Sequence, residues 1–185
     1  NPRERQLYRL DLDRPGAPVQ VTQGAGWHAV TIAEDASVFL DSFSNVTTPP
    51  TLRLHRSDGR LLQALVPNTL DATHPWTPYL PDQAPTTFGT MQAADGQLLH
   101  YAITRPKVLE PGRRYPVIVD VYGGPGVQTV RNAWVGGLDQ VLASRGFLVF
   151  SLDNRGTAGR GHAFVDGLAH LDADLAAARR QAPAR

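Results

Sequence analysis

Between Gln6 and Val66, apolar and polar residues alternate in short segments that are separated by turn residues. The first segment has a clean period of two, which is typical of a β-strand with one buried face. The pattern predicts six short antiparallel strands without a helical period, at residues 7–12, 19–21, 28–33, 38–43, 51–55 and 61–65. Such a series is typical of a sandwich, a barrel or a β-propeller, and about one and a half four-stranded blades are too few to close any of these.

Residues 67–85 interrupt this pattern with five prolines and few periodic apolar residues. Proline-rich segments of this kind act as stiff linkers, and domain boundaries commonly fall within them. The sequence therefore predicts two domains, residues 1–82 and residues 83–185.

The second domain has a different order of elements. Two segments, 88–92 and 98–104, flank a hairpin signal at Ala94-Asp95-Gly96-Gln97. Continuous apolar runs follow at 115–121 and 147–152, with a helix-compatible segment, 138–145, between them that ends at Gly146. Apolar residues recur at helical spacing from Leu168 to Ala178. Strands alternating with helices predict the opening half of an α/β domain, so the expected fold class is mixed β and α/β.

The run at 115–121 is short and rich in β-branched residues, which predicts a strand buried on both faces. Tyr122-Gly123-Gly124-Pro125-Gly126 follows it directly. Glycines let the chain pass close to a ligand just beyond the carboxyl end of a strand, where open α/β sheets place their active sites. A phenol held there could donate a hydrogen bond to a developing oxyanion, so Tyr122 is the candidate catalytic residue. A plain Gly-Pro turn, with the tyrosine ring packed at a domain interface, is the alternative interpretation.

Composition narrows the possible partners. The formal net charge of +1 gives no electrostatic reason to expect nucleic acid or an acidic membrane surface. No apolar run approaches the roughly 18–20 residues of a membrane span, and the first residues do not resemble a signal peptide. The absence of cysteine excludes disulfides and thiolate chemistry, and it fits a periplasmic or a cytoplasmic location equally well.

The sequence lacks the other common catalytic and cofactor motifs. None of the six serines lies in Gly-x-Ser-x-Gly, the turn that exposes a hydrolase nucleophile. The histidines form no His-Glu-x-x-His pair, and His170 with Asp172 and Asp174 is better explained as a solvated helix face than as a metal site. The glycines from Gly156 to Gly161 fit neither the dinucleotide nor the P-loop spacing. We expect no cofactor and no metal.

Several stretches together resemble the prolyl oligopeptidase family of serine peptidases, most closely its bacterial dipeptidyl peptidase IV-like members. The resemblance extends over roughly residues 1–160. The most specific stretches are Arg114–Pro125 and Phe150–Thr157, and Asn1–Arg5, Gly26–Val30 and Asp95–Tyr101 are also similar.

The resemblance implies the end of a β-propeller followed by the N-terminal part of an α/β-hydrolase domain. It implies peptide substrates from which dipeptides ending in Pro or Ala are released by acyl-enzyme chemistry, with Tyr122 as an oxyanion-hole donor. In this family the serine, aspartate and histidine lie later in the hydrolase domain, and an acidic pair upstream in the propeller binds the substrate amino group. A homodimer is possible for a complete enzyme of this kind.

The family pattern is lost near Gly161, because the family continues to Gly-x-Ser-x-Gly-Gly and this sequence reaches Arg185 without it. Either the sequence is a piece of a longer chain, or the gene is truncated or frameshifted. We expect this chain alone to be inactive. Two alternatives to a peptidase segment remain open: a non-catalytic remnant or binding module, and a different α/β hydrolase with a β-rich appendage.

Overall fold

The structure is a computed structural model that describes residues 1–14, 16–165, 176–177 and 179–180. Its residues form two compact units. Unit 1 consists of residues 1–78 together with 131–134, and unit 2 consists of residues 79–130 and 135–185. Both units are built mainly from β-sheet, and each is described by itself below.

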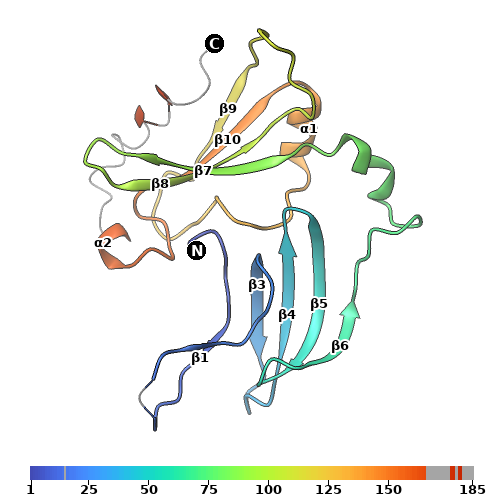
Figure 1. Cartoon of the computed structure of the whole chain (residues 1–185), viewed down its shortest axis with the longest axis vertical. Coiled ribbons are helices and arrows are strands. Elements are labelled where there is room, and N and C mark those ends of the chain that lie inside the picture. The colour runs from blue at the N-terminus through green and yellow to red at the C-terminus, as the bar shows by residue number, and fades with distance from the viewer. Residues whose placement is uncertain (15, 166–175, 178, 181–185) are drawn as a thin grey trace. The chain divides into compact units, whose positions relative to one another are not determined.

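Unit 1 contains a four-stranded antiparallel sheet in the order β3-β4-β5-β6 (Figure 1). Short hairpin turns join neighbouring strands, so sequence neighbours are also neighbours in the sheet, as the alternating pattern predicted. The strands are β3 (Trp27–Ile32), β4 (Val38–Asn45), β5 (Thr48–Arg56) and β6 (Leu61–Val66).

The central strand β4 has alternating burial, and Phe39, Asp41 and Phe43 are its buried residues. His28 of β3 lies opposite Phe43 in the register, and the two rings are 4.6 Å apart. Its Nδ1 lies 2.8 Å from the nearer carboxylate oxygen of Asp41. Both members of this pair are almost inaccessible to water. A buried polar pair therefore lies between aromatic side chains on the face of the sheet that is packed.

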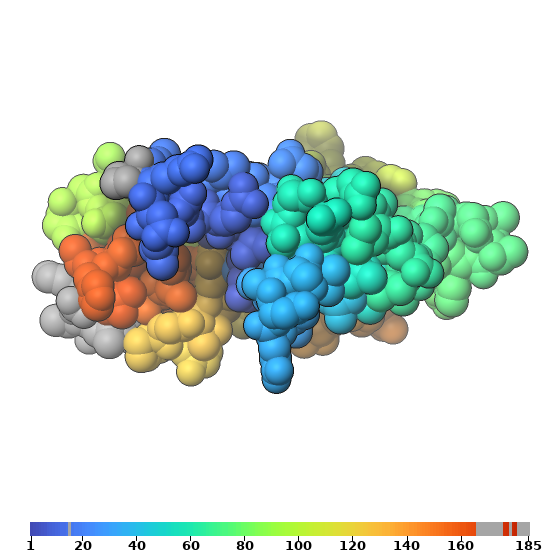
Figure 2. Space-filling model, turned by 90° about the horizontal axis from the view of Figure 1, so that it is seen from below, coloured from blue at the N-terminus to red at the C-terminus, as the bar shows by residue number. Residues whose placement is uncertain are grey.

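The first strand is much shorter than the sequence predicts. It is reduced to β1 (Tyr8–Arg9), which pairs only with β2 (Val19–Gln20). Leu10 and Leu12 have no strand partner among the described residues and are exposed, at 51% and 89%. This hairpin lies at the surface of unit 1, where it is the blue segment in Figure 2. A segment with alternating apolar residues forms a strand only where a second strand pairs with it. Here the pairing covers two residues.

Residues 131–134 are remote in sequence from the rest of unit 1 and are held to it by several contacts. The Asn132 N–H donates to the Arg3 carbonyl oxygen (2.7 Å), and the Trp134 N–H donates to the Ser44 hydroxyl (3.2 Å). The Trp134 ring meets Trp76 edge-on at 5.9 Å. No periodic pattern in the sequence marks this segment, and its contacts to unit 1 involve both its backbone and its side chains.

Unit 2 contains a second four-stranded sheet in the order β7-β8-β10-β9 (Figure 1). Strand β8 is antiparallel to both β7 and β10, whereas β9 and β10 are parallel. The parallel pair is connected through helix α1 (Leu138–Ser144), as expected for a βαβ crossover. The strands are β7 (Thr86–Gln92), β8 (Leu98–Thr104), β9 (Val117–Asp120) and β10 (Leu148–Asp153).

Strand β10 forms the centre of this sheet and is buried along almost its whole length, as its continuous apolar run predicted. Phe150 stacks on Tyr101 of β8 at 5.4 Å. The core around it comprises Met91, Ala93, Leu99, Phe150, Leu152 and Phe164.

The prediction that the run at 115–121 is a strand buried on both faces is wrong for the described residues. The strand found there, β9, pairs only with β10, and Val119 is 40% exposed. An apolar run shows that a strand can be buried, but elements packed against both faces of the sheet are needed to bury it, and the second half of β9 is exposed.

The helix predicted at 138–145 is present as α1, and Gly146 follows it with a φ of 87°, which suits a helix C-terminus. A 3₁₀-helix, η1 (Thr77–Asp82), lies in the proline-rich segment, and a short helix, α2 (His162–Val165), follows β10. The helix predicted from Leu168 to Ala178, with His170, Asp172 and Asp174, lies largely outside the described residues. In the part of the chain that is described, no helix is long and apolar enough to cross a membrane.

Candidate active site

The candidate site lies where the parallel strands β9 and β10 end, at the same edge of the sheet. Strand β9 ends at Asp120, and the turn with Tyr122 begins two residues later. Tyr122 is 56% exposed. Gly123 and Gly126 have φ values of 71° and 76°, in the left-handed region that favours glycine. These glycines therefore let the chain turn sharply away from the sheet after β9, and the Tyr122 side chain stays exposed.

Gly124 has a separate steric reason to be glycine. A Cβ atom at this position would lie 2.8 Å from Cε1 of the Tyr122 ring, which is closer than real Cβ contacts allow. The tyrosine ring therefore lies against the backbone of Gly124, and any larger residue there would displace the ring.

A second turn, Asp153–Thr157, follows β10 at the same edge. The Asp153 side chain bonds to Thr129 and Val130, which follow the glycine turn in the sequence. Its Oδ1 accepts hydrogen bonds from the Thr129 N–H (2.7 Å), the Val130 N–H (3.0 Å) and the Thr129 hydroxyl (3.0 Å). The Gly126 N–H also donates to the Gly156 carbonyl oxygen (2.8 Å). The two turns are therefore bonded to each other, through a side chain and through the backbone.

Arg155 in this second turn forms an ion pair with Asp95, which lies in the β7–β8 hairpin turn. The guanidinium donates to both carboxylate oxygens, at 2.7 Å and 2.5 Å, in the bidentate geometry that arginine favours. The Arg155 side chain is buried, and that of Asp95 is half exposed. The Arg155 hydrogen bond, together with the Gln97 N–H, lowers the pKa of Asp95 to about 2.

The Asp95–Arg155 pair leads to a pH prediction. Because the folded-state pKa of Asp95 is depressed, its contribution to stability is present above its ordinary pKa near 4 and is lost as the pH falls towards 2. We expect Asp95→Asn to melt at a lower temperature than the wild-type chain at pH 6. The difference should shrink steadily as the pH falls from 4 to 2, where about half of Asp95 is protonated in the folded state. Thermal unfolding followed by circular dichroism between pH 2 and 6 measures it.

A matched control for this measurement is Asp58→Asn. Asp58 also lies in a hairpin turn, but its carboxylate accepts only the Arg60 N–H, at 2.9 Å, among the bonds of the described residues. If the two variants showed the same pH dependence, the ion pair would not be the cause.

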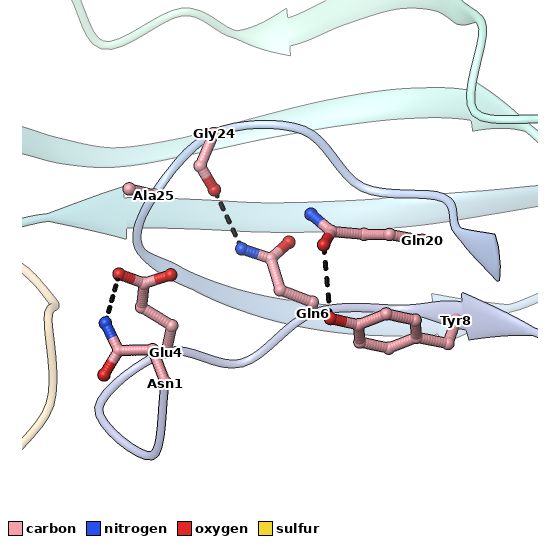
Figure 3. A pocket seen from close by; sticks show the side chains of 7 residues that line it. All are labelled: Asn1, Glu4, Gln6, Tyr8, Gln20, Gly24 and Ala25. Carbon is pink, nitrogen blue, oxygen red and sulfur yellow. Dashed lines mark hydrogen bonds between the residues drawn. The ribbon is translucent and has the colours of Figure 1, made fainter. Parts of the chain in front are cut away.

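Within the described residues, no three histidine, aspartate or glutamate side chains lie close enough together to hold a metal ion. Unit 1 contains a polar hollow of about 520 Å³, lined by Asn1, Glu4, Gln6, Tyr8, Gln20, Gly24 and Ala25 (Figure 3). Its side chains bond largely to one another or to the backbone. The Tyr8 hydroxyl donates to Gln20 (3.2 Å), and the Gln6 amide donates to the Gly24 carbonyl oxygen (2.8 Å). This arrangement holds the β1–β2 hairpin together and leaves few polar groups to act on a substrate.

Sequence reasoning singled out Tyr122 and missed Asp153, Arg155 and Asp95. The only available signal for the first two was an acidic and a basic residue directly after a buried strand. Tyr122 can donate a hydrogen bond, but an oxyanion forms only after a nucleophile has attacked. The turn can therefore supply one part of an acyl-transfer site, and the role of Tyr122 stays a prediction.

Comparison with known proteins adds independent information. Residues 1–50 match the family model described as Dipeptidyl peptidase IV (DPP IV) N-terminal region. The chain is 29% identical over 173 residues to human Dipeptidyl peptidase 8, covering 89% of this chain and 19% of that protein. It is 31% identical over 165 residues to the Emericella nidulans protein named "Probable dipeptidyl-aminopeptidase B", covering 88% and 18%.

A solved structure agrees with these matches. Dipeptidyl peptidase 4 of Porphyromonas gingivalis superposes with a TM-score of 0.76 at 25% identity, over 89% of this chain and 23% of that one. The chain spans about a fifth of the length of the curated relatives it matches. Sequence and structure together confirm the resemblance to dipeptidyl peptidase IV-like proteins, which extends over most of the length of this chain.

Proposed function

We propose that this chain is a segment of a dipeptidyl peptidase IV-like serine peptidase, an enzyme that releases dipeptides ending in Pro or Ala from the amino termini of peptides. Residues 1–82 would form the end of its β-propeller, and residues 83–185 the opening part of its α/β-hydrolase domain. The observation that supports this best is the length of the match. Likeness to two proteins named as dipeptidyl peptidases or aminopeptidases extends over 88–89% of this chain, and so includes both sheets.

In this proposal Tyr122 is the oxyanion-hole donor. Attack on the scissile carbonyl turns its oxygen into an anion, and a hydrogen bond from the phenol stabilises that charge more than it stabilises the neutral carbonyl. The exposed position of Tyr122, at the carboxyl end of β9, suits such a donor.

The remaining chemistry requires an activated nucleophile, a base and a group that orients the base. This sequence has no serine on a Gly-x-Ser-x-Gly turn and no cysteine. The proposal therefore assigns these three groups to parts of the protein outside the 185 residues. It also makes peptides, and not nucleic acid, the partner of the complete enzyme.

The test uses the full-length protein that contains this sequence. We expect it to hydrolyse a chromogenic Xaa-Pro substrate with a free amino terminus, and to be labelled at one serine by a fluorophosphonate probe. The 185-residue chain alone should show neither reaction. The proposal is wrong if the full-length protein lacks both activities, or if a serine within these 185 residues is labelled stoichiometrically and turnover is lost when it is replaced by alanine.

A further inference from the structure

The residues after β9 form a loop that leaves the sheet beside Asp153 and returns to Asp153. The parallel register pairs Leu148 with Val117 and Ser151 with Asp120. If the ladder continued, Tyr122 would lie opposite Asp153. Instead the chain turns away through the glycines, and at Thr129 and Val130 it is again bonded to Asp153. One side chain therefore holds the base of the loop that contains Tyr122.

The three hydrogen bonds at the base of this loop share one buried acceptor, the Asp153 carboxylate. Two of the donors are backbone N–H groups, and all three share one carboxylate oxygen. Because this oxygen is buried, a donor that loses it is left without a partner, which costs more than the loss of an exposed hydrogen bond. Asp153 is only 3% exposed and Val130 is fully buried, so water does not readily replace these bonds.

Two further hydrogen bonds between described residues involve the loop. The Gly126 N–H donates to the Gly156 carbonyl oxygen, and the Gln128 amide donates within the loop to the Val130 carbonyl oxygen (3.2 Å). Four consecutive positions, Gly123 to Gly126, are glycine or proline, and three of them are glycines that do little to hold the loop in one conformation. A rigid position for Tyr122 must therefore come from the loop ends, and Asp153 fixes the end that is not in the sheet.

We infer that Asp153 is a positioning residue for Tyr122: its carboxylate closes the loop and so fixes where the phenol can donate a hydrogen bond. This inference rests on the proposed function, because it matters for catalysis only if Tyr122 is the oxyanion donor. Oxyanion stabilisation depends on a donor that is already in place before charge develops. Loss of the Asp153 carboxylate therefore lowers the rate through Tyr122.

The kinetic test uses the full-length protein, with Asp153→Ala and Asp153→Asn. We expect Asp153→Ala to lower kcat by about 10²-fold, the cost of misplacing a catalytic group by about 1 Å, with KM changed less than about threefold. Asp153→Asn retains an oxygen that can accept the backbone N–H groups, so it should recover a substantial part of the lost rate. Asp58→Ala, a turn carboxylate of unit 1, is the matched control and should leave kcat unchanged.

The decisive variant combines Asp153→Ala with Tyr122→Phe. If Asp153 acts through Tyr122, the double variant is no slower than Tyr122→Phe alone, because the donor being positioned is already gone. Losses that multiply would overturn the inference. So would a kcat of Asp153→Ala equal to that of the wild type.

A second measurement does not depend on activity. Amide hydrogen exchange of the peptide covering residues 121–130 should be at least tenfold faster in Asp153→Ala than in the wild type, raised less in Asp153→Asn, and unchanged in Asp58→Ala. Unchanged exchange in both Asp153 variants would contradict the inference. If Tyr122→Phe were fully active while exchange at 121–130 still rose, the proposed role of Tyr122 would fail and the role of Asp153 in holding the loop would stand.

Discussion

Replacing Tyr122 by phenylalanine in the full-length protein is expected to lower kcat by about 10²–10³-fold and to leave KM nearly unchanged. The substitution removes one hydroxyl and keeps the ring that lies against Gly124, so the turn should keep its conformation. The lost hydrogen bond would be made in the transition state and only weakly to the bound substrate, which is why binding should survive. Steady-state hydrolysis of a chromogenic Xaa-Pro substrate measures both constants.

The matched control for this variant is Tyr8→Phe, which removes the same hydroxyl from an exposed tyrosine of unit 1. Its hydroxyl bonds to Gln20 in the surface hairpin, and its loss should not change kcat. Labelling by a fluorophosphonate should also slow in Tyr122→Phe, because that reaction builds negative charge on oxygen. Full activity of Tyr122→Phe would contradict the assignment, and the tyrosine would then be a packing residue of its turn.

The strands and helix that could be predicted from the sequence are those with a clear local signal, such as a hairpin turn, a continuous apolar run or a terminal glycine. Hairpins place β3 to β6 in order, and Gly146 marks the end of α1. The errors occur where pairing decides the outcome. Among the described residues, Leu10 and Leu12 alternate correctly but have no strand beside them, and the strand that contains Val119 pairs along one edge only.

The candidate site was predicted in part. Tyr122 was found because glycines directly after an apolar run are a visible signal. Asp153 was not found, because its partners are the backbone N–H groups of Thr129 and Val130, and backbone donors leave no mark in a sequence. Arg155 and Asp95 are 60 residues apart in the chain, and only the folded sheet brings the two turns together.

The His28–Asp41 pair illustrates the same limit within unit 1. Asp41 lies two residues from Phe43, the register partner of His28, so the three side chains share one face of the sheet. That relation follows from the register of β3 and β4, which alternation alone leaves open by two residues in either direction. Once the register is known, it follows that the His28 and Asp41 side chains lie on the same face of the sheet.

Replacing Asp41 by alanine is expected to destabilise unit 1 by about 3 kcal/mol. The change leaves the His28 ring buried, with Nδ1 deprived of the carboxylate at 2.8 Å, and opens a small cavity beneath β4. His28 Nε2 lies 3.3 Å from the Gly24 carbonyl oxygen, a long contact that cannot replace the lost partner. With roughly 2–4 °C per kcal/mol for a chain of this size, the melting temperature should fall by about 6–12 °C.

Two further variants separate the lost hydrogen bond from other effects of removing an aspartate. Asp41→Asn keeps the shape and one acceptor oxygen, so it should lose less stability than Asp41→Ala. Asp13→Ala removes an exposed carboxylate of the β1–β2 hairpin and should stay within about 0.5 kcal/mol of the wild type. Thermal unfolding of the three variants, followed by tryptophan fluorescence, gives the comparison. If Asp41→Ala melted like Asp13→Ala, the buried pair would contribute nothing to the stability of the sheet, and the packing of Phe39 and Phe43 would be sufficient to hold β3 and β4 together.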